Sequence, residues 1–138
     1  MKIQFIDHSE DVSAELLNLA QGVLEEVSGE LESAVKRNTA VDTGQTKGSW
    51  THNVTVDGDQ TVGVVGSPLQ NAIWEEFGTG EYALNGDGRK GGWFYVDEKG
   101  EGHFTHGKHP RRPFHKAYTS LKDKLIAHIQ DTFRKGMS

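Results

Sequence analysis

The strongest constraint on the fold is a stripe of apolar residues that recurs every three or four positions near the start of the chain. The stripe consists of Val12, Leu16, Leu19, Val23, Val27, Leu31 and Val35. This spacing puts an apolar side chain on the same side of each helical turn, so it predicts a long amphipathic helix that must be covered by other elements. Asp7 or Ser9 can cap its start. Gly22 and Gly29 lie inside it, and each costs about 1 kcal/mol relative to alanine.

A second stripe of the same kind closes the chain and predicts a C-terminal helix. It consists of Phe114, Ala117, Tyr118, Leu121, Leu125, Ile129 and Phe133, and Pro113 stands where a first helical turn tolerates proline. Between the two helices, β-branched runs at 49–56 and 60–66 flank an Asp-Gly turn and predict a hairpin. Residues 93–96 and 103–105 predict a second hairpin.

The remaining connections complete an α+β fold. Residues 39–48 are rich in turn formers and predict a loop, and residues 69–77 predict a short helix or an extended piece. The expected architecture is therefore an antiparallel β-sheet of about four strands, packed by the long N-terminal helix and the C-terminal helix. A chain of 138 residues suits a single domain, here residues 1–138. No apolar run approaches a membrane span, no signal peptide is expected at the start, and the lack of cysteine excludes disulfides and thiolate chemistry.

Charge is distributed unevenly between the two ends. Residues 1–34 hold one lysine against eight carboxylates, a net charge of −7, whereas residues 108–135 hold eight lysines and arginines against two aspartates, a net charge of +6. Three interpretations follow: the ends pair within one fold, the acidic face of one copy meets the basic face of the next, or the basic face meets phosphate.

The central segment 73–80 combines aromatic and acidic residues and leads into a glycine-rich stretch. Six glycines follow within 78–92: Gly78, Gly80, Gly86, Gly88, Gly91 and Gly92. Read as a strand-like platform before a flexible loop at about 78–92, this segment is better suited to gripping another protein than to holding a nucleophile. It lacks the Gly-Lys-Ser/Thr of a phosphate-binding loop and the strand–loop–helix setting of a dinucleotide site.

Residues that could carry chemistry do not form a convincing set. His103, His106, His109 and His115 fall in predicted strand and loop, where we expect solvated side chains; the alternative is a small metal-dependent hydrolase or nuclease that uses them. Adjacent Glu75 and Glu76 would point to opposite faces of a strand, so Glu76 is expected to be an interface or capping carboxylate. A basic patch is either a solvated face with intramolecular partners or a phosphate contact; it consists of Lys108, Arg111, Arg112 and Lys116. We predict no catalytic residues, no metal and no cofactor.

Three short motifs in a fixed order resemble a known family. They are Val41-Asp42-Thr43-Gly44 with Ser49-Trp50, then Asn71 to Thr79 (Asn-Ala-Ile-Trp-Glu-Glu-Phe-Gly-Thr), then Pro110-Arg111-Arg112-Pro113-Phe114 with Ala117. Over roughly residues 10–130 the chain resembles the tail-completion (head–tail joining, minor tail component) proteins of long-tailed bacteriophages. Thr46 and Asn71 depart from the leucine and tyrosine that this family usually has.

The resemblance implies a structural virion protein rather than an enzyme. Such a protein forms a homo-oligomeric ring, usually a hexamer, at the neck, between the tail tube protein and the head connector or stopper protein. The ring surrounds the channel, where non-specific contact with DNA is expected, and no membrane is involved; before assembly the protein is expected in the host cytoplasm. We hypothesise an interface made of Trp74, Glu76, Phe77, Gly78, Thr79, Arg89, Lys90, Arg111 and Arg112.

Overall fold

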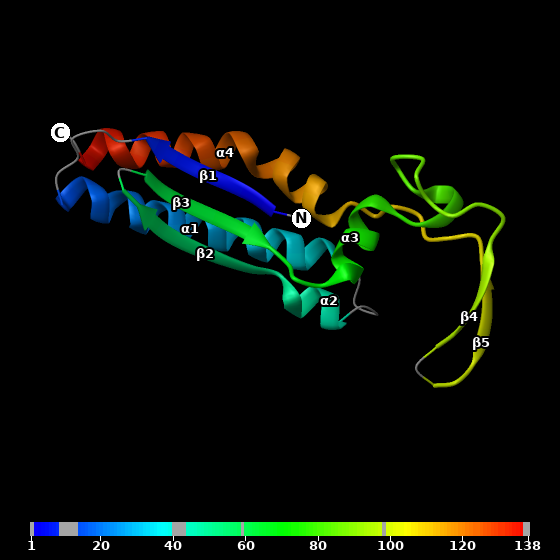
Figure 1. The fold of residues 1–138 in the computed structure, drawn as a ribbon. Helices are drawn as coiled ribbons and strands as arrows, with labels where there is room; N and C mark the ends of the chain where they lie inside the picture. The colour runs from blue at the N-terminus through cyan, green and yellow to red at the C-terminus, as the bar shows by residue number, and fades with distance from the viewer. Residues whose placement is uncertain (1, 9–13, 40–43, 59, 98, 137–138) are drawn as a thin grey trace.

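The protein consists of a helix-and-sheet body from which a long hairpin projects (Figure 1). A computed structural model describes residues 2–8, 14–39, 44–58, 60–97 and 99–136. The elements of the body are β1 (Lys2–His8), α1 (Ala14–Asn38), α2 (Gly44–Ser49), β2 (Thr51–Asp57), β3 (Gln60–Gly66), α3 (Gln70–Phe77) and α4 (Pro113–Gly136). The segment between α3 and α4, residues 78–112, we call the arm. It contains a short 3-10 helix (Gly80–Tyr82) and the strands β4 (Trp93–Val96) and β5 (Gly102–Thr105).

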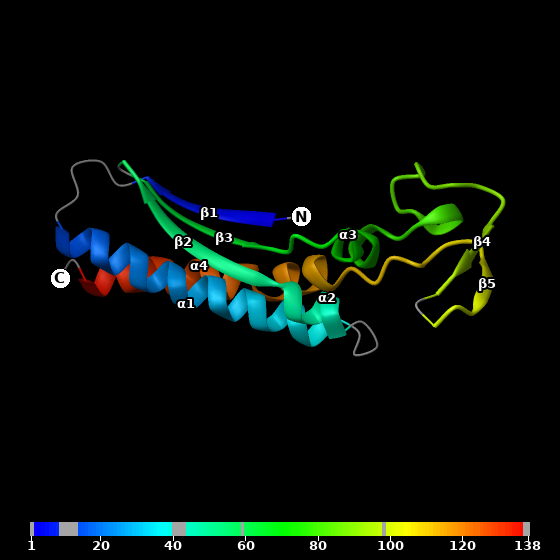
Figure 2. The same ribbon diagram turned by 60° about the horizontal axis from the view of Figure 1, so that its bottom comes forward.

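The body is a three-stranded antiparallel sheet covered by helices on one face. The strand order is β1-β3-β2, and β2 pairs with β3 from Thr51–Gly66 to Asp57–Gln60. The long helices α1 and α4 pack against each other, and α1 packs along β2 and β3. Figure 2 shows both long helices on the same side of the sheet, and no helix of the described residues covers the other face.

The core lies between the two long helices and the sheet. Trp50, between α2 and β2, is fully buried, with its ring 5.7 Å from that of Phe114 at the start of α4. The other core residues are Val23, Leu24, Val27, Leu31, Ala34, Val35, Val65, Ala72, Ala117 and Leu125. Residues of both predicted stripes therefore face each other, which is the physical reason why both helices form.

The α+β class, both long helices and both hairpins are confirmed. We expected one sheet of about four strands, but the described strands form two sheets. Strands β1, β2 and β3 form one sheet, and β4 pairs with β5 alone. Strand β1 was not predicted, because its pairing with β3 joins residues more than fifty positions apart, from Lys2–Gly66 to His8–Gln60. Asp7 lies within β1 and does not cap α1, while Ser9 lies outside the described residues.

Two local predictions were wrong. Residues 44–48 belong to α2 rather than to a loop, and Thr46 of that helix is buried; residues 40–43 lie outside the described residues. Gln70–Phe77 forms helix α3, which confirms the helix expected as one alternative for residues 69–77. The strand-like platform expected at 73–80 was wrong, so Glu75 and Glu76 do not point to opposite faces of a sheet. Short helices of this kind form because tertiary contacts cover them, and local patterns carry little signal for that.

Opposite charges on the long helices meet within the chain. Lys124 of α4 lies 2.9 Å from Glu30 of α1, and His128 lies 2.8 Å from Glu26. The interpretation that the acidic and basic ends pair inside one fold therefore holds for Lys124 and Glu30. Both pairs are largely exposed, so each adds at most about 1 kcal/mol of stability.

Candidate assembly interface

Two buried carboxylates of α3 anchor the second half of the arm and the start of α4. Glu76 has its side chain fully buried, and its two oxygens accept the backbone N–H groups of Phe114 and His115, both at 2.9 Å. These N–H groups have no partner inside the helix, and a negative charge at this end suits the helix dipole. Of the two roles expected for Glu76, interface or capping carboxylate, the structure shows capping of α4 from within the molecule.

Glu75 holds the residues just before α4. Its backbone carbonyl accepts N–H groups from Arg111 at 2.9 Å and Arg112 at 3.2 Å, and its buried carboxylate pairs with the ammonium of Lys108. Arg112 adopts a φ of 55°, a left-handed conformation that lets both N–H groups reach the same carbonyl. Among the described residues, one carboxylate oxygen of Glu75 has no hydrogen-bond partner. Together the two glutamates fix where the arm returns to the body.

The two halves of the arm are joined closely at their base. Thr79 exchanges backbone and side-chain hydrogen bonds with Lys108 at 2.9 and 2.8 Å, and Glu81 donates its backbone N–H to the carbonyl of His106 at 2.9 Å. Gly80 has a φ of 62°, and a methyl group there would collide with the His106 carbonyl oxygen. Glycine is needed here for close packing. The flexibility of residues 78–92 stays a prediction.

Five of the proposed interface residues line one hollow at the arm's base. Trp74, Phe77, Gly78, Thr79 and Arg89 surround a cavity of about 410 Å³. Trp74 is 44% exposed and also borders a neighbouring groove of about 470 Å³ beneath β4 and β5. The structure therefore brings these residues together on one surface at the junction of body and arm.

The other proposed residues lie around this junction. Lys90 is exposed beside Arg89, whose guanidinium lies 5.5 Å from the centre of the Trp93 ring. Arg111 is exposed, whereas Arg112 is half-buried and its guanidinium lies 6.0 Å from the centre of the Phe77 ring. Arg111 and Arg112 thus flank the start of α4, where Glu76 already occupies the N–H groups that an outside phosphate would need.

Sequence reasoning missed the most exposed apolar surface of the chain. Phe94 pairs directly with Phe104, and they are 67% and 63% exposed, with Val96 on the same face at 62%. Opposed residues of an antiparallel pair share a face, so these three side chains form one apolar surface, which we call the aromatic face. The signal was available: the run Trp93-Phe94-Tyr95-Val96 is apolar without alternation, which predicts that both faces of the hairpin are to be covered.

The four late histidines do not come together. His103 lies 2.8 Å from Asp97, His106 lies 3.4 Å from Glu81, and the ring of His109 stacks on Tyr82. His115 is exposed on α4. Across the described ranges, one group has ligand atoms close enough to hold a metal ion, and it contains only His103 of the four, with Asp97 and Glu101 at the exposed hairpin tip. Hydrogen bonds from His103 and the backbone lower the pKa of Asp97.

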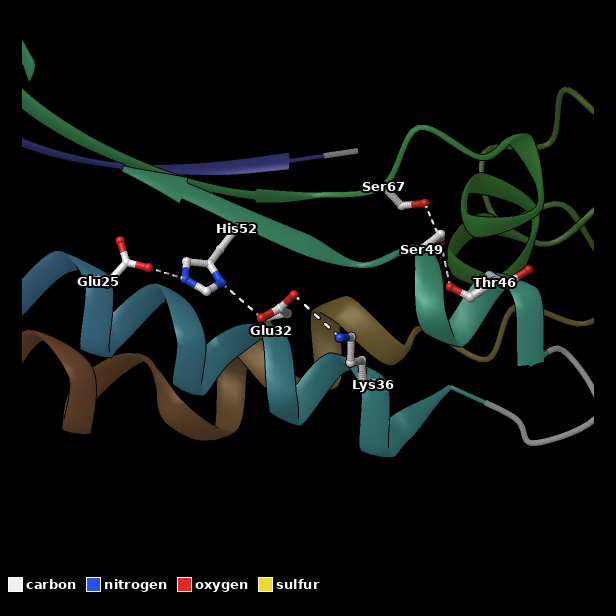
Figure 3. A network of polar contacts seen from close by, with 7 residues as sticks. All are labelled: Glu25, Glu32, Lys36, Thr46, Ser49, His52 and Ser67. Atoms are coloured by element: carbon white, nitrogen blue, oxygen red, sulfur yellow. Dashed lines mark hydrogen bonds and ion pairs between the residues drawn. The ribbon is translucent and has the colours of Figure 1, made fainter. Parts of the chain in front are cut away.

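A polar network fastens β2 to the elements around it (Figure 3). His52 lies 2.8 Å from Glu32 and 2.6 Å from Glu25, both on α1. Ser49 lies 2.6 Å from Ser67, which ties α2 to the connection between β3 and α3. Burial works against the charged form of His52, but the hydrogen bonds and charges of the two glutamates outweigh it and raise its pKa.

This constellation of buried anchors, a projecting hairpin and exposed aromatic surface defines a protein built for contact with other proteins. Comparison with known families agrees. The HK97-gp10-like family, described as "Bacteriophage HK97-gp10, putative tail-component", matches residues 3–78, and the chain belongs to this family. No curated protein and no solved structure matches it significantly.

The family membership confirms the resemblance to phage tail components. It indicates a structural rather than an enzymatic role, a place in the virion, and contacts with other virion proteins. The matched region ends at Gly78, where the arm begins, so it runs from β1 to α3 and leaves the arm and α4 outside it. In the parts of the chain that the structure describes, no helix is both long and apolar enough to span a bilayer.

Proposed function

We propose that this protein forms a ring at the head-proximal end of the phage tail, where it completes the tail and joins it to the head. The ring is homo-oligomeric, with six copies as the expected number. One side meets the tail tube protein and the other meets the head connector or stopper protein. The family membership supports the broader role of tail component, and the surface of the arm supports a role in assembly.

The observation that carries the proposal is the projecting hairpin with its exposed aromatic face. Two strands without a third, or without a covering helix, are at best marginally stable in water. Phe94, Val96 and Phe104 each leave more than 60% of their surface exposed, so a hairpin of this composition is suited to burial against another protein. Within a tail component, that protein is another virion subunit.

The basic residues at the start of α4 fit a position beside the DNA channel. Arg111 and Lys116 are exposed there, and contact with phosphates would be non-specific, since no base-reading arrangement is needed for a channel wall. Binding to DNA fragments should then be weak and should fall steeply as salt is raised.

Electron microscopy of particles tests the proposed location. Phage particles that carry this protein with a fused, electron-dense tag should show one ring of label at the junction of tail and head. When the gene is silenced, tails of normal length should accumulate beside filled, unjoined heads. Label along the whole tube, or at the tip far from the head, would contradict the proposal.

A further inference from the structure

We propose that the tip of the arm's hairpin binds a zinc ion through Asp97, Glu101 and His103, and that the ion links β4 to β5. The sequence by itself predicts a solvated His103 and no metal, but the folded chain places two carboxylates beside its imidazole. One imidazole and two carboxylates are ligand types that zinc accepts. The inference concerns the single chain and does not depend on the proposed ring.

The three ligand atoms converge at one point of the tip. They all lie within 4.8 Å of one another, and Nε2 of His103 lies 2.8 Å from Oδ2 of Asp97. Ligands at about 2.1 Å from a tetrahedral zinc ion are about 3.4 Å apart. Glu101 is exposed, so rotation of its side chain can bring the set to this spacing.

Asp97 is held in an orientation that suits a ligand. Its Oδ1 accepts the backbone N–H groups of Lys99 at 2.9 Å and Glu101 at 2.8 Å, which leaves Oδ2 directed at His103. Its own backbone N–H donates to the carbonyl of Glu101 at 2.9 Å. A side chain with a fixed position loses little conformational freedom on binding, so less of the binding energy is lost to ordering.

The ring of His103 is oriented by a residue outside the ligand set. Tyr95 lies directly opposite His103 in the register of β4 and β5, and the two rings stack with their centroids 5.2 Å apart. Outer contacts that orient a ligating histidine strengthen metal binding. The stacking fixes the plane of the imidazole while Nε2 faces Asp97.

The carboxylates of the tip carry negative charge that no lysine or arginine of the described chain compensates by an ion pair. Among the described residues, Lys99 forms no ion pair with Asp97 or Glu101, and the ion-pair partner of Asp97 is His103. Like charges close together repel each other. A divalent cation between them would remove this repulsion, because a bound cation is the largest charge in such a site.

The position of the site gives the ion a structural role. Asp97 directly follows β4 and His103 lies in β5, so one ion joins both strands at the tip, which projects away from the body (Figure 1). A two-stranded hairpin is at best marginally stable in water. An ion that binds the folded hairpin and not the unfolded one adds its binding free energy to folding. In a chain without cysteine, the ion would link the strands as a disulfide does elsewhere.

Calorimetric titration with zinc chloride tests the site in the untagged full-length protein, after treatment with a chelator. We expect a single strong site per chain. Glu101→Gln and His103→Gln should each weaken it at least about tenfold, since each removes one ligand. His106→Gln is the matched control, because His106 belongs to the same arm but lies 3.4 Å from Glu81; this change should leave the affinity unaltered.

Hydrogen exchange tests whether the ion links the strands. Zinc should slow the exchange of backbone amides in β4 and β5 of the unaltered protein and of His106→Gln, but not of Glu101→Gln. The Glu101→Gln variant keeps the backbone hydrogen bonds between residue 101 and Asp97, so it separates loss of the metal from loss of the turn. Circular dichroism establishes that each variant is folded.

Three results would overturn the proposal. Equal zinc affinity in the unaltered protein and in both ligand variants would show that zinc binds elsewhere. A loss of affinity in His106→Gln as large as that in His103→Gln would remove the site from the hairpin tip. Zinc binding at the tip without slower exchange would refute the link between the strands. None of these results bears on the ring, which electron microscopy tests separately.

Discussion

At the scale of single residues, the adjacent buried glutamates Glu75 and Glu76 make different contacts where α3, the arm and α4 meet. Glu76 closes the first turn of α4, whereas Glu75 holds Lys108 and the two arginine N–H groups that precede the helix. Both side chains are buried, and a buried carboxylate is tolerated only when hydrogen bonds or an opposite charge compensate for lost hydration. Replacement of either glutamate should therefore lower the free energy of unfolding.

Replacement of Glu76 by alanine should lower the free energy of unfolding by about 2 kcal/mol, because two buried N–H groups lose a charged acceptor. Urea denaturation followed by tryptophan fluorescence measures the change. Asp123→Asn, on the exposed side of the same helix, is the control and should change stability by less than about 0.5 kcal/mol. A loss as small as that of the control would argue against the capping role.

The raised pKa of His52 predicts a pH dependence of stability. Its stabilising contribution is fully present below the unfolded value of about 6.5 and is lost as pH rises through the higher pKa of the folded state. Urea denaturation at several pH values should show this decrease, and His52→Gln should remove it. His115→Gln, at an exposed position, should leave it intact. An NMR titration that places the pKa of His52 at or below 6.5 would refute the prediction.

At the scale of elements, the two halves of the arm are held together by contacts at its base rather than at its tip. Backbone hydrogen bonds join the N–H of Thr79 to the carbonyl of Lys108 and the N–H of Glu81 to the carbonyl of His106. Each of these carbonyl oxygens lies so close to a glycine that a side chain at the glycine position would collide with it. The glycines that suggested a mobile loop thus fall into two groups. Gly80 and Gly107 permit close approach of the two halves, while Gly86 and Gly91 have open space around them.

Gly80→Ala should disrupt the base of the arm. The new methyl group would collide with the His106 carbonyl in addition to straining a φ of 62°. Hydrogen exchange should show lost protection at the Glu81 amide and, through the displaced strand, around β5. Gly86→Ala has a similar φ of 72° but no neighbouring atom within 4 Å, so it tests backbone strain alone. Equal effects of the two substitutions would show that close packing is unimportant.

At the scale of the whole molecule, the body contains the hydrophobic core and the arm carries the exposed aromatic surface. Every described residue of the main core lies in the body, and Lys124 of α4 and Glu30 of α1 neutralise part of each other's charge. None of the described arm residues belongs to the core, and the arm holds the most exposed aromatic side chains that the structure describes. Folding and assembly are therefore expected to respond to different parts of the chain.

Replacement of residues 94–104 by a short Gly-Ser linker should separate these two properties. The free energy of unfolding should change by less than about 1 kcal/mol, since no core contact is removed. Ring formation, measured by electron microscopy, should be abolished. A scrambled-loop control that keeps Phe94, Val96 and Phe104 as a hairpin should still assemble. Rings formed by the shortened chain would remove the hairpin from the assembly interface.

The amino-acid sequence alone determined the periodic elements and the family. Apolar residues repeated every three or four positions predict α1 and α4, and β-branched runs around Asp57-Gly58 predict the β2–β3 hairpin, because these patterns reflect local backbone geometry. The order of three short motifs was enough to indicate a phage tail component, which the family match over residues 3–78 confirms.

Only the tertiary structure decided how distant residues meet. The addition of β1 to β3, the capping of α4 by Glu76, and the junction where Trp74, Phe77 and Arg89 gather all join residues far apart in the chain. The same holds for exposure: a run such as Trp93–Val96 suggests burial, yet the described chain leaves most of it uncovered. Local sequence patterns indicate which apolar side chains are to be buried. The three-dimensional packing decides whether they are buried within this chain or against another protein.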